Sequence, residues 1–265
     1  MSRYVAMGSS MAAGPGIRPR ATGAPRGCGR SAHNYPHLVA QRLNLDLVDV
    51  TCSGATTAHV LNDRQRGAPP QIDALDGSET LVTITIGGND VGYIPLLMAA
   101  ALLGSARRLV PGRRGTRDRR VSRLLPVIGS LLDPAAREQA LDHSGESLRR
   151  VGAAVRRRAP QARVVFVDYL TVLPPAGTSA APLADTDAEL GRYVATRLEE
   201  LTAAAAAATG CMIVRAGAAS REHHAWSANP WTAGATWPLP RRPAPFHPNA
   251  AGMAAVADLI VQSTR

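Results

Sequence analysis

The sequence of 265 residues contains no lysine, so all 30 positions of the Lys-plus-Arg class are arginine and the formal net charge is +10. Aromatic residues are also scarce, at 4% of the chain. A protein that binds nucleic acid is expected to place aromatic side chains among its basic ones. The arginine bias accompanies many alanines, glycines and prolines, which indicates GC-rich coding. We therefore expect no nucleic-acid partner.

The basic residues concentrate in one stretch of the chain. Its members are Arg107, Arg108, Arg113, Arg114, Arg117, Arg119, Arg120 and Arg123. No aromatic residue lies among them. We interpret the stretch as a solvated face, with weak attraction to anionic lipid surfaces or to acidic substrates as the alternative.

Long hydrophobic runs are missing. No apolar run reaches the roughly 18 residues that a membrane-spanning helix needs, which predicts a soluble protein. Strand-like sequence begins within a few residues of Met1. We therefore expect no signal peptide in this chain, and a cytoplasmic protein if Met1 is the natural start. The length suits one α/β domain over residues 1–265.

Cysteine is rare, with only Cys28, Cys52 and Cys211. The number is odd, and no spacing resembles a zinc site, so we expect no bound metal. Two interpretations of Cys28 and Cys52 fit the composition equally well. They either form a disulfide in an oxidising compartment or remain free buried thiols.

Five apolar runs predict β-strands: Tyr4–Met7, Leu45–Thr51, Thr80–Ile86, Arg163–Asp168 and Met212–Arg215. Most are nearly continuous, as is typical of parallel strands covered on both faces. Helical periodicity separates them, at Tyr35–Leu43, Ala135–Arg158, Asp185–Thr209 and Asn249–Gln262. This order predicts an α/β fold, a flavodoxin-like three-layer sandwich with helices on both faces of a five-stranded parallel sheet.

The interval from about 91 to 161 is unusually long for a connection between two strands. It is apolar over Ile94–Leu103, rich in arginine to Arg123, and apolar again over Leu124–Leu132. We expect a helical insertion whose basic loop overhangs the strand ends. It is either a lid that shelters an acyl chain or an ordinary insertion.

Small and polar residues follow each of the first three predicted strands. They are Gly8-Ser9-Ser10, the stretch Cys52 to Thr57, and Gly87-Gly88-Asn89-Asp90. Because ligands bind outside the carboxyl ends of parallel strands, these turns are expected to meet at one site. Ser10 is a candidate nucleophile there. Glycine lets backbone N–H groups approach a ligand, and Asn89 adds an amide donor, so the turns predict an oxyanion hole.

A serine nucleophile also needs a base. Of the seven histidines, His247 lies between Pro245 and Pro248, which stiffen its loop, and Asn249 can cap the last helix. We interpret His247 as the candidate base, with a surface histidine as the alternative.

These segments, in this order, resemble the SGNH (GDSL) hydrolase family, particularly its actinobacterial lipase and esterase branch. That family has Gly-Asp-Ser after strand one, Gly after strand two, Gly-x-Asn-Asp after strand three and Asp-x-x-His-Pro near the C-terminus. The matching segments here are Gly8-Ser9-Ser10, Gly54, Gly87-Gly88-Asn89-Asp90 and Ala244-Pro245-Phe246-His247-Pro248. The resemblance runs essentially from end to end.

The resemblance implies Ser10 as nucleophile and His247 as general base. The N–H groups of Ser10 and Gly54 and the Asn89 amide would form the oxyanion hole, and Cys28 would pair with Cys52. It further implies an esterase that needs no cofactor and acts on small-molecule or lipid esters. We expect short or medium acyl chains and a monomer. The branch is often secreted. Alternatives are an acyltransferase that uses a sugar or another alcohol, and a binding module without activity.

Two positions depart from the family pattern. Ser9 stands where the family has aspartate before the nucleophile, and Ala244 stands where it has the third triad member. Without that carboxylate, His247 needs another partner to fix its tautomer. Three interpretations remain open: a main-chain carbonyl near Ala244, a carboxylate from elsewhere such as Glu222, or a protein that no longer catalyses.

Overall fold

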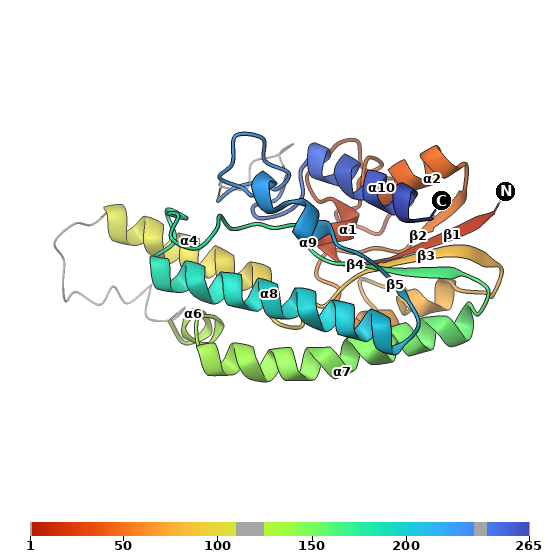
Figure 1. Cartoon of the computed structure of the whole chain (residues 1–265), viewed down its shortest axis with the longest axis horizontal. Helices are drawn as coiled ribbons and strands as arrows, with labels where there is room; N and C mark the ends of the chain where they lie inside the picture. Colours follow the sequence, from red (N-terminus) through yellow and green to blue (C-terminus); the bar gives the residue numbers. More distant parts are fainter. Residues whose placement is uncertain (1, 110–124, 236–242, 265) are drawn as a thin grey trace.

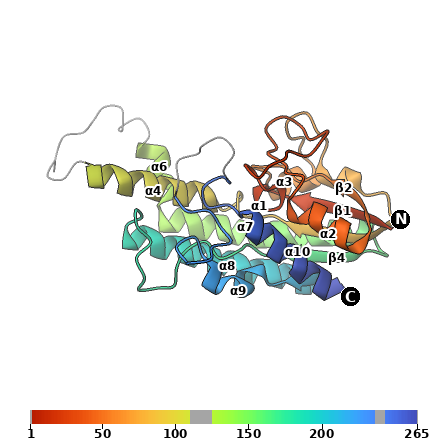
Figure 2. The same cartoon turned by 90° about the horizontal axis from the view of Figure 1, so that it is seen from above.

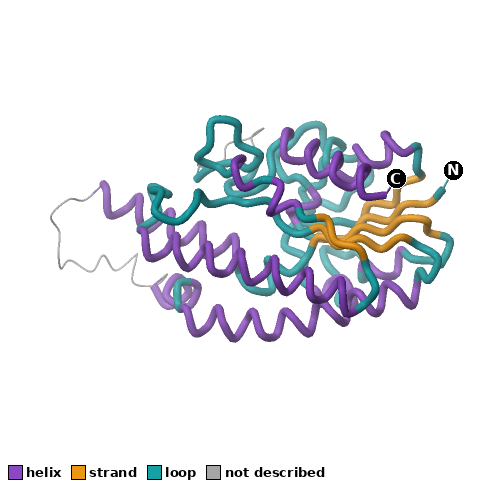
Figure 3. Tube along the Cα trace, viewed as in Figure 1, coloured by secondary structure: helices purple, strands orange, loops and turns teal. Residues whose placement is uncertain are grey.

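The fold is built on one parallel β-sheet. The computed structural model describes residues 2–109, 125–235 and 243–264. Its strands are β1 (Arg3–Gly8), β2 (Asp46–Asp49), β3 (Glu79–Thr85), β4 (Arg163–Val167) and β5 (Met212–Val214). They lie in the order β2-β1-β3-β4-β5, and every neighbouring pair is parallel (Figure 1, Figure 3). The predicted five-stranded parallel sheet is confirmed.

Three strands are shorter than predicted, and one of them, β4, ends at Val167 rather than at Asp168. β2 lies at the edge of the sheet and covers only Asp46–Asp49, although the Val50 and Cys52 N–H groups still donate to the Ala6 and Gly8 carbonyls at 3.0 Å. β5 ends at Val214 because Arg215 is already the N-cap of the next helix.

Helices cover both faces of the sheet. They are α1 (Ser10–Ala13), α2 (Tyr35–Leu43), α3 (Thr57–Leu61), α4 (Tyr93–Leu109), α6 (Leu125–Leu131), α7 (Pro134–Arg158), α8 (Asp185–Ala208), α9 (Ala216–Ala219) and α10 (Ala250–Thr264), with 3-10 turns at Gln71–Ala74 and Arg221–His223. Helices α2 and α10 pack together on one face, and α3, α7 and α8 lie against the other (Figure 1, Figure 2). This is the expected three-layer sandwich.

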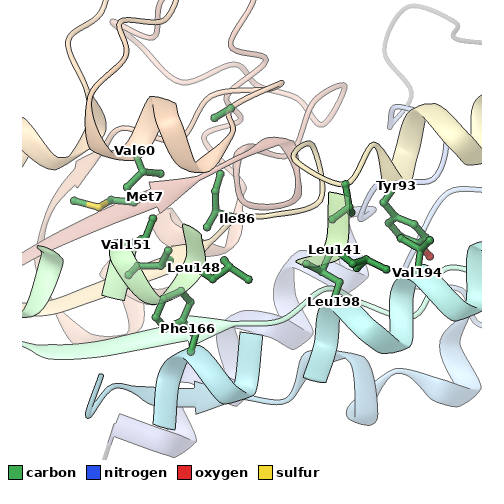
Figure 4. Close-up of a cluster of buried hydrophobic side chains, with 14 of the residues drawn as sticks. Met7, Val60, Ile86, Tyr93, Leu141, Leu148, Val151, Phe166, Val194 and Leu198 are labelled. Carbon is green, nitrogen blue, oxygen red and sulfur yellow. The ribbon is translucent and has the colours of Figure 1, made fainter. Parts of the chain in front are cut away.

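The core is divided by the sheet into two clusters. In β1, Val5 and Met7 belong to the cluster under α7 and α8, whereas Tyr4 and Ala6 belong to the cluster under α2 and α10. Figure 4 shows Met7 and Phe166 within the first cluster. Successive side chains of a strand point to opposite faces, and here both faces are covered. This explains the continuous apolar runs in the sequence.

The interval between β3 and β4 is helical at both ends, as predicted. Helix α4 packs on α8, and α6 packs on α4 and α7. The centre of the predicted insertion, residues 110–124, lies outside the described residues, and so do the side chains of the whole arginine-rich stretch. The lid and the ordinary insertion therefore both stay predictions. No helix in the described ranges is long and apolar enough to span a membrane.

A buried carboxyl group follows β4. Asp168 is 3% exposed, and its Oδ1 accepts the Gly217 N–H at 2.8 Å, at the start of α9. Its Oδ2 is buried without a hydrogen-bond partner in the described part of the chain. Burial, assisted by the nearby Glu199 carboxylate, raises the pKa of Asp168 to about 7. The charged form is therefore unfavourable in the folded protein.

We expect Asp168→Asn to stabilise the protein at high pH. Between its ordinary pKa of 3.8 and about 7, the folded Asp168 holds more proton than the unfolded chain does. Stability therefore falls as pH rises through this window, and the full penalty is present above pH 7. Urea unfolding at pH 8 should show a gain of about 2 kcal/mol, and the gain should vanish near pH 4.

Asp142→Asn is the control, because Asp142 is exposed on α7. It should leave the free energy of unfolding nearly unchanged at both pH values. A gain for Asp168→Asn that is equal at pH 4 and pH 8 would contradict the assigned role of its charge.

Candidate active site

A tight backbone contact fixes the turn that carries Ser10. Gly8 has φ +147°, and a Cβ there would lie 2.4 Å from the Thr85 carbonyl oxygen, so only glycine fits. The next N–H, of Ser9, donates to that same oxygen at 2.9 Å. The Gln71 side chain accepts the Gly8 N–H at 2.7 Å and donates to the Gly8 carbonyl at 3.1 Å. These bonds hold the end of β1 where α1 begins with Ser10.

The structure brings Ser10 and His247 together from opposite ends of the chain. His247 Nε2 lies 2.8 Å from Ser10 Oγ, although 237 residues separate them. Both side chains are buried, at 7% and 9% exposure. This is the contact expected between a nucleophile and its base.

The other ring nitrogen of His247 faces the main chain. Nδ1 lies 2.7 Å from the Pro245 carbonyl oxygen, which can only accept a hydrogen bond. Nδ1 therefore carries the hydrogen, and Nε2 presents its lone pair to the Ser10 hydroxyl. Among the described residues, no hydrogen bond or ion pair joins Glu222 to His247. The expected carbonyl near Ala244 is thus that of Pro245, and the Glu222 interpretation is wrong for this structure.

The histidine loop is anchored on both sides. Phe246 is fully buried and adopts φ +61°, a left-handed conformation that is uncommon for a non-glycine residue. Its N–H donates to the Ala233 carbonyl at 3.0 Å, and the Ala233 N–H donates to the His247 carbonyl at 2.8 Å. The Ala244 N–H donates to the Pro15 carbonyl, close to the Ser10 turn, at 3.0 Å. Surrounding contacts thus hold a strained backbone beside the base.

The C-terminal side of the loop is fixed by the last helix. The side-chain oxygen of Asn249 accepts the Gly252 N–H at 2.9 Å, which caps α10 as predicted. The Asn249 amide group also donates to the Pro230 carbonyl at 2.6 Å.

The second and third turns are tied to each other. The Asn89 side chain donates to the Ala55 carbonyl at 2.8 Å, and this leaves its second amide hydrogen available. The Asp90 carboxylate accepts the Thr57 N–H at 3.1 Å, which caps α3. Gly54 has φ +82° and is exposed. In the described part of the chain, no acceptor is bonded to its N–H or to that of Ser10.

The cysteines pair as the resemblance implies. Cys28 and Cys52 form a disulfide, and the Ser53 N–H donates to the Cys28 carbonyl at 2.9 Å. The bridge thus lies directly before the Gly54 turn. Cys211 is free and half-buried. The described ranges contain no group of three or more His, Cys, Asp or Glu side chains that could hold a metal ion.

An apolar groove of about 470 Å³ lies beside the histidine loop. One wall is α4, and the other includes Pro245 and Phe246. The α4 side chains in the groove include Pro95, Met98, Ala99 and Leu102. Met98 and Leu102 are 39% and 50% exposed, so the groove presents large apolar side chains to solvent.

Sequence reasoning missed Gln71 and Tyr169, which contact the turn before Ser10. The Tyr169 hydroxyl lies 3.0 Å from Ser9 Oγ and accepts the Gly88 N–H at 3.0 Å. Tyr169 follows β4, so the rule that placed the first three turns at one sheet edge would also have found it. Gln71 follows no strand, and no pattern in the sequence marks it.

The chain is similar in sequence to known lipases. Residues 6–255 match the GDSL-like Lipase/Acylhydrolase family. The chain is 34% identical to "Lipase 2" of Streptomyces coelicolor, covering 96% of this chain and 83% of that protein. It is 28% identical to "Lipase" of Streptomyces rimosus, over 94% of this chain and 81% of that protein.

Solved structures agree in architecture. The extracellular lipase of Streptomyces rimosus superposes with a TM-score of 0.76 at 26% identity, covering 100% of this chain and 99% of the other. Phospholipase A1 of Streptomyces albidoflavus superposes with a TM-score of 0.73 at 25% identity, covering 99% and 98%. The chain therefore belongs to the GDSL-like lipase/acylhydrolase family, the SGNH hydrolases, and is a carboxylic ester hydrolase.

Proposed function

We propose that the protein hydrolyses esters with short to medium acyl chains through a Ser10 acyl-enzyme. The observation that carries the proposal is the hydrogen-bonded series Ser10 Oγ, His247 Nε2, His247 Nδ1 and Pro245 O, with distances of 2.8 and 2.7 Å. It supplies a nucleophile, a base and a group that fixes the tautomer of the base.

The reaction proceeds in two halves. Ser10 Oγ attacks the ester carbonyl carbon while its proton passes to His247 Nε2, and the carbonyl oxygen takes up negative charge. The N–H groups of Ser10 and Gly54 and the Asn89 amide stabilise that charge. His247 then protonates the departing alcohol, which leaves an acyl group on Ser10. Water, activated by His247, releases the acid and restores the serine.

The carbonyl of Pro245 differs from a carboxylate in one respect. It fixes the tautomer of His247 equally well, but a dipole stabilises the imidazolium less than a full negative charge does. Burial lowers the pKa of His247, and the hydrogen bond to Pro245 raises it by less. His247 therefore stays neutral, and able to accept a proton, at pH values below its ordinary pKa of 6.5.

Ser10→Ala tests the nucleophile. It should lower kcat for p-nitrophenyl butyrate and octanoate by about 10⁴-fold or more. Ser263→Ala, at the far end of α10, is the control and should retain full activity. Equal nitrophenol release by wild type and Ser10→Ala would indicate a binding module.

If an added alcohol acceptor yields an acylated alcohol in preference to the free acid, the protein is an acyltransferase.

The pH profile tests the base. Because the neutral imidazole is the active form and its pKa is lowered, the acid limb of kcat/KM should have its midpoint below pH 6.5. His143→Gln, which changes an exposed histidine of α7, should leave the midpoint unmoved. A midpoint at or above 6.5 in the wild-type enzyme is the result that rejects this assignment.

The acyl chain is proposed to lie in the groove along α4. The lining residues Pro95, Met98, Ala99 and Leu102 recur at helical spacing and form one apolar stripe. The stripe extends about 10 Å along the helix axis. Pro245 and Phe246 of the His247 loop line the same groove, which supports the proposal that an acyl group attached to Ser10 extends into it. Each buried methylene contributes about 0.8 kcal/mol, which favours medium over short chains.

Leu102→Trp tests the acyl site by filling the groove. We expect kcat/KM to fall about tenfold more for the octanoate than for the butyrate ester, since roughly two methylene groups lose their contact. Ala204→Trp adds the same side chain at an exposed position of α8, outside the groove, and should affect both esters equally. An unchanged octanoate-to-butyrate ratio in Leu102→Trp would place the acyl chain elsewhere.

A further inference from the structure

One buried hydroxyl group connects the nucleophile turn to the oxyanion turn. Tyr169 lies two residues beyond the end of β4, and its Oη lies 3.0 Å from Ser9 Oγ and 3.0 Å from the Gly88 nitrogen. Ser9 immediately precedes Ser10, and Gly88 immediately precedes Asn89. A single atom thus contacts the residue before the nucleophile and the residue before the amide donor.

The Gly88 peptide is held from two sides. A Cβ on Gly88 would lie 2.3 Å from Cε2 of the Tyr169 ring, so the ring packs directly on the glycine backbone. The Gly88 carbonyl in turn accepts the Tyr93 N–H at 2.8 Å, at the start of α4. With both polar groups of Gly88 occupied, the adjacent Asn89 has little freedom to shift.

Of the two hydrogen bonds that Tyr169 Oη makes, only the one with Gly88 has a fixed donor. The Gly88 N–H can only donate, so Tyr169 Oη accepts there. Between Tyr169 Oη and Ser9 Oγ either oxygen can be the donor. Burial raises the pKa of Tyr169 to about 12, so the phenol is protonated at neutral pH. Successive hydrogen bonds of this kind polarise and strengthen one another.

We propose that Tyr169 is a positioning residue that sets the separation between the Ser10 N–H and the Asn89 amide, and so the geometry of the oxyanion hole. This inference rests on the proposed function of Ser10 and Asn89. Ser9, which stands where the family has aspartate, supplies the hydroxyl that Tyr169 contacts on the nucleophile side.

The chain offers a matched comparison in Tyr4. It is also fully buried, and its hydroxyl lies 2.7 Å from Thr83 Oγ1. That bond joins two side chains within the sheet and contacts neither turn. Removing the Tyr4 hydroxyl therefore costs a buried hydrogen bond without moving a catalytic group, whereas removing the Tyr169 hydroxyl also frees the Gly88 N–H.

The first test is kinetic. Tyr169→Phe should lower kcat roughly tenfold while KM changes less than twofold, because the oxyanion hole acts on the transition state more than on bound substrate. Tyr4→Phe should leave kcat within twofold. The thermal midpoints of both variants are measured alongside. Equal losses of kcat in the two variants would reduce Tyr169 to a structural role and overturn the proposal.

The second test uses an alkyl trifluoromethyl ketone. Ser10 Oγ adds to its carbonyl carbon, the serine proton moves to His247, and the ketone oxygen becomes an oxyanion. Its Ki should rise about tenfold in Tyr169→Phe, in parallel with kcat/KM, and stay unchanged in Tyr4→Phe. An unchanged Ki in Tyr169→Phe contradicts the proposal even if kcat falls.

A third measurement separates failure of the inference from failure of the proposed function. In an Asn89→Ala background the further loss from Tyr169→Phe should be under twofold, since the group that Tyr169 positions is gone. A full tenfold loss in that background means that Tyr169 acts elsewhere. If Ser10→Ala is inactive but Tyr169→Phe behaves as wild type, only this inference fails. If Ser10→Ala is active, the proposed function itself fails.

Discussion

The close contact between the ends of β1 and β3 is the constraint on which the site depends. Gly8 approaches the Thr85 carbonyl so tightly that no side chain fits between them. This contact ends β1 and starts α1 at Ser10, next to the turn that follows β3. Because the strands are parallel, the Gly54 and Asn89 turns lie at the same edge of the sheet as this contact. Hydrogen bonds then fix the turns of the site relative to one another.

These hydrogen bonds mostly join a side chain to the main chain. Asn89 bonds the Ala55 carbonyl, Tyr169 bonds the Gly88 N–H, and Gln71 bonds both polar groups of Gly8. Each uses a buried polar group that would be costly to leave unpaired, so each also specifies one arrangement of the turns. Packing holds the sheet together, but these bonds determine the positions of the reacting groups.

Much of the architecture could be predicted from the sequence. Continuous apolar runs gave the parallel sheet, and turns of small residues after the strands indicated where Ser10 and Asn89 lie. The strand ends were less accurate, because the chain continues beside β1 after Asp49, with bonds from the Val50 and Cys52 N–H groups, and periodicity does not mark where the regular strand ends. Tyr169 and Gln71 were missed because their roles arise from contacts between distant segments. The partner of His247 could not be chosen, because every residue carries a carbonyl.

That last property has an evolutionary consequence. A carboxylate can be lost from a catalytic site by one codon change, whereas a main-chain oxygen persists whichever side chain stands at position 245. The orienting function is encoded in the path of the loop, in the left-handed turn at Phe246 and its bonds to Ala233. The side chain of Ala244 therefore takes no part in orienting His247. The site is robust to point substitution at the position of its third member and vulnerable instead to insertions or deletions that change the length of the loop.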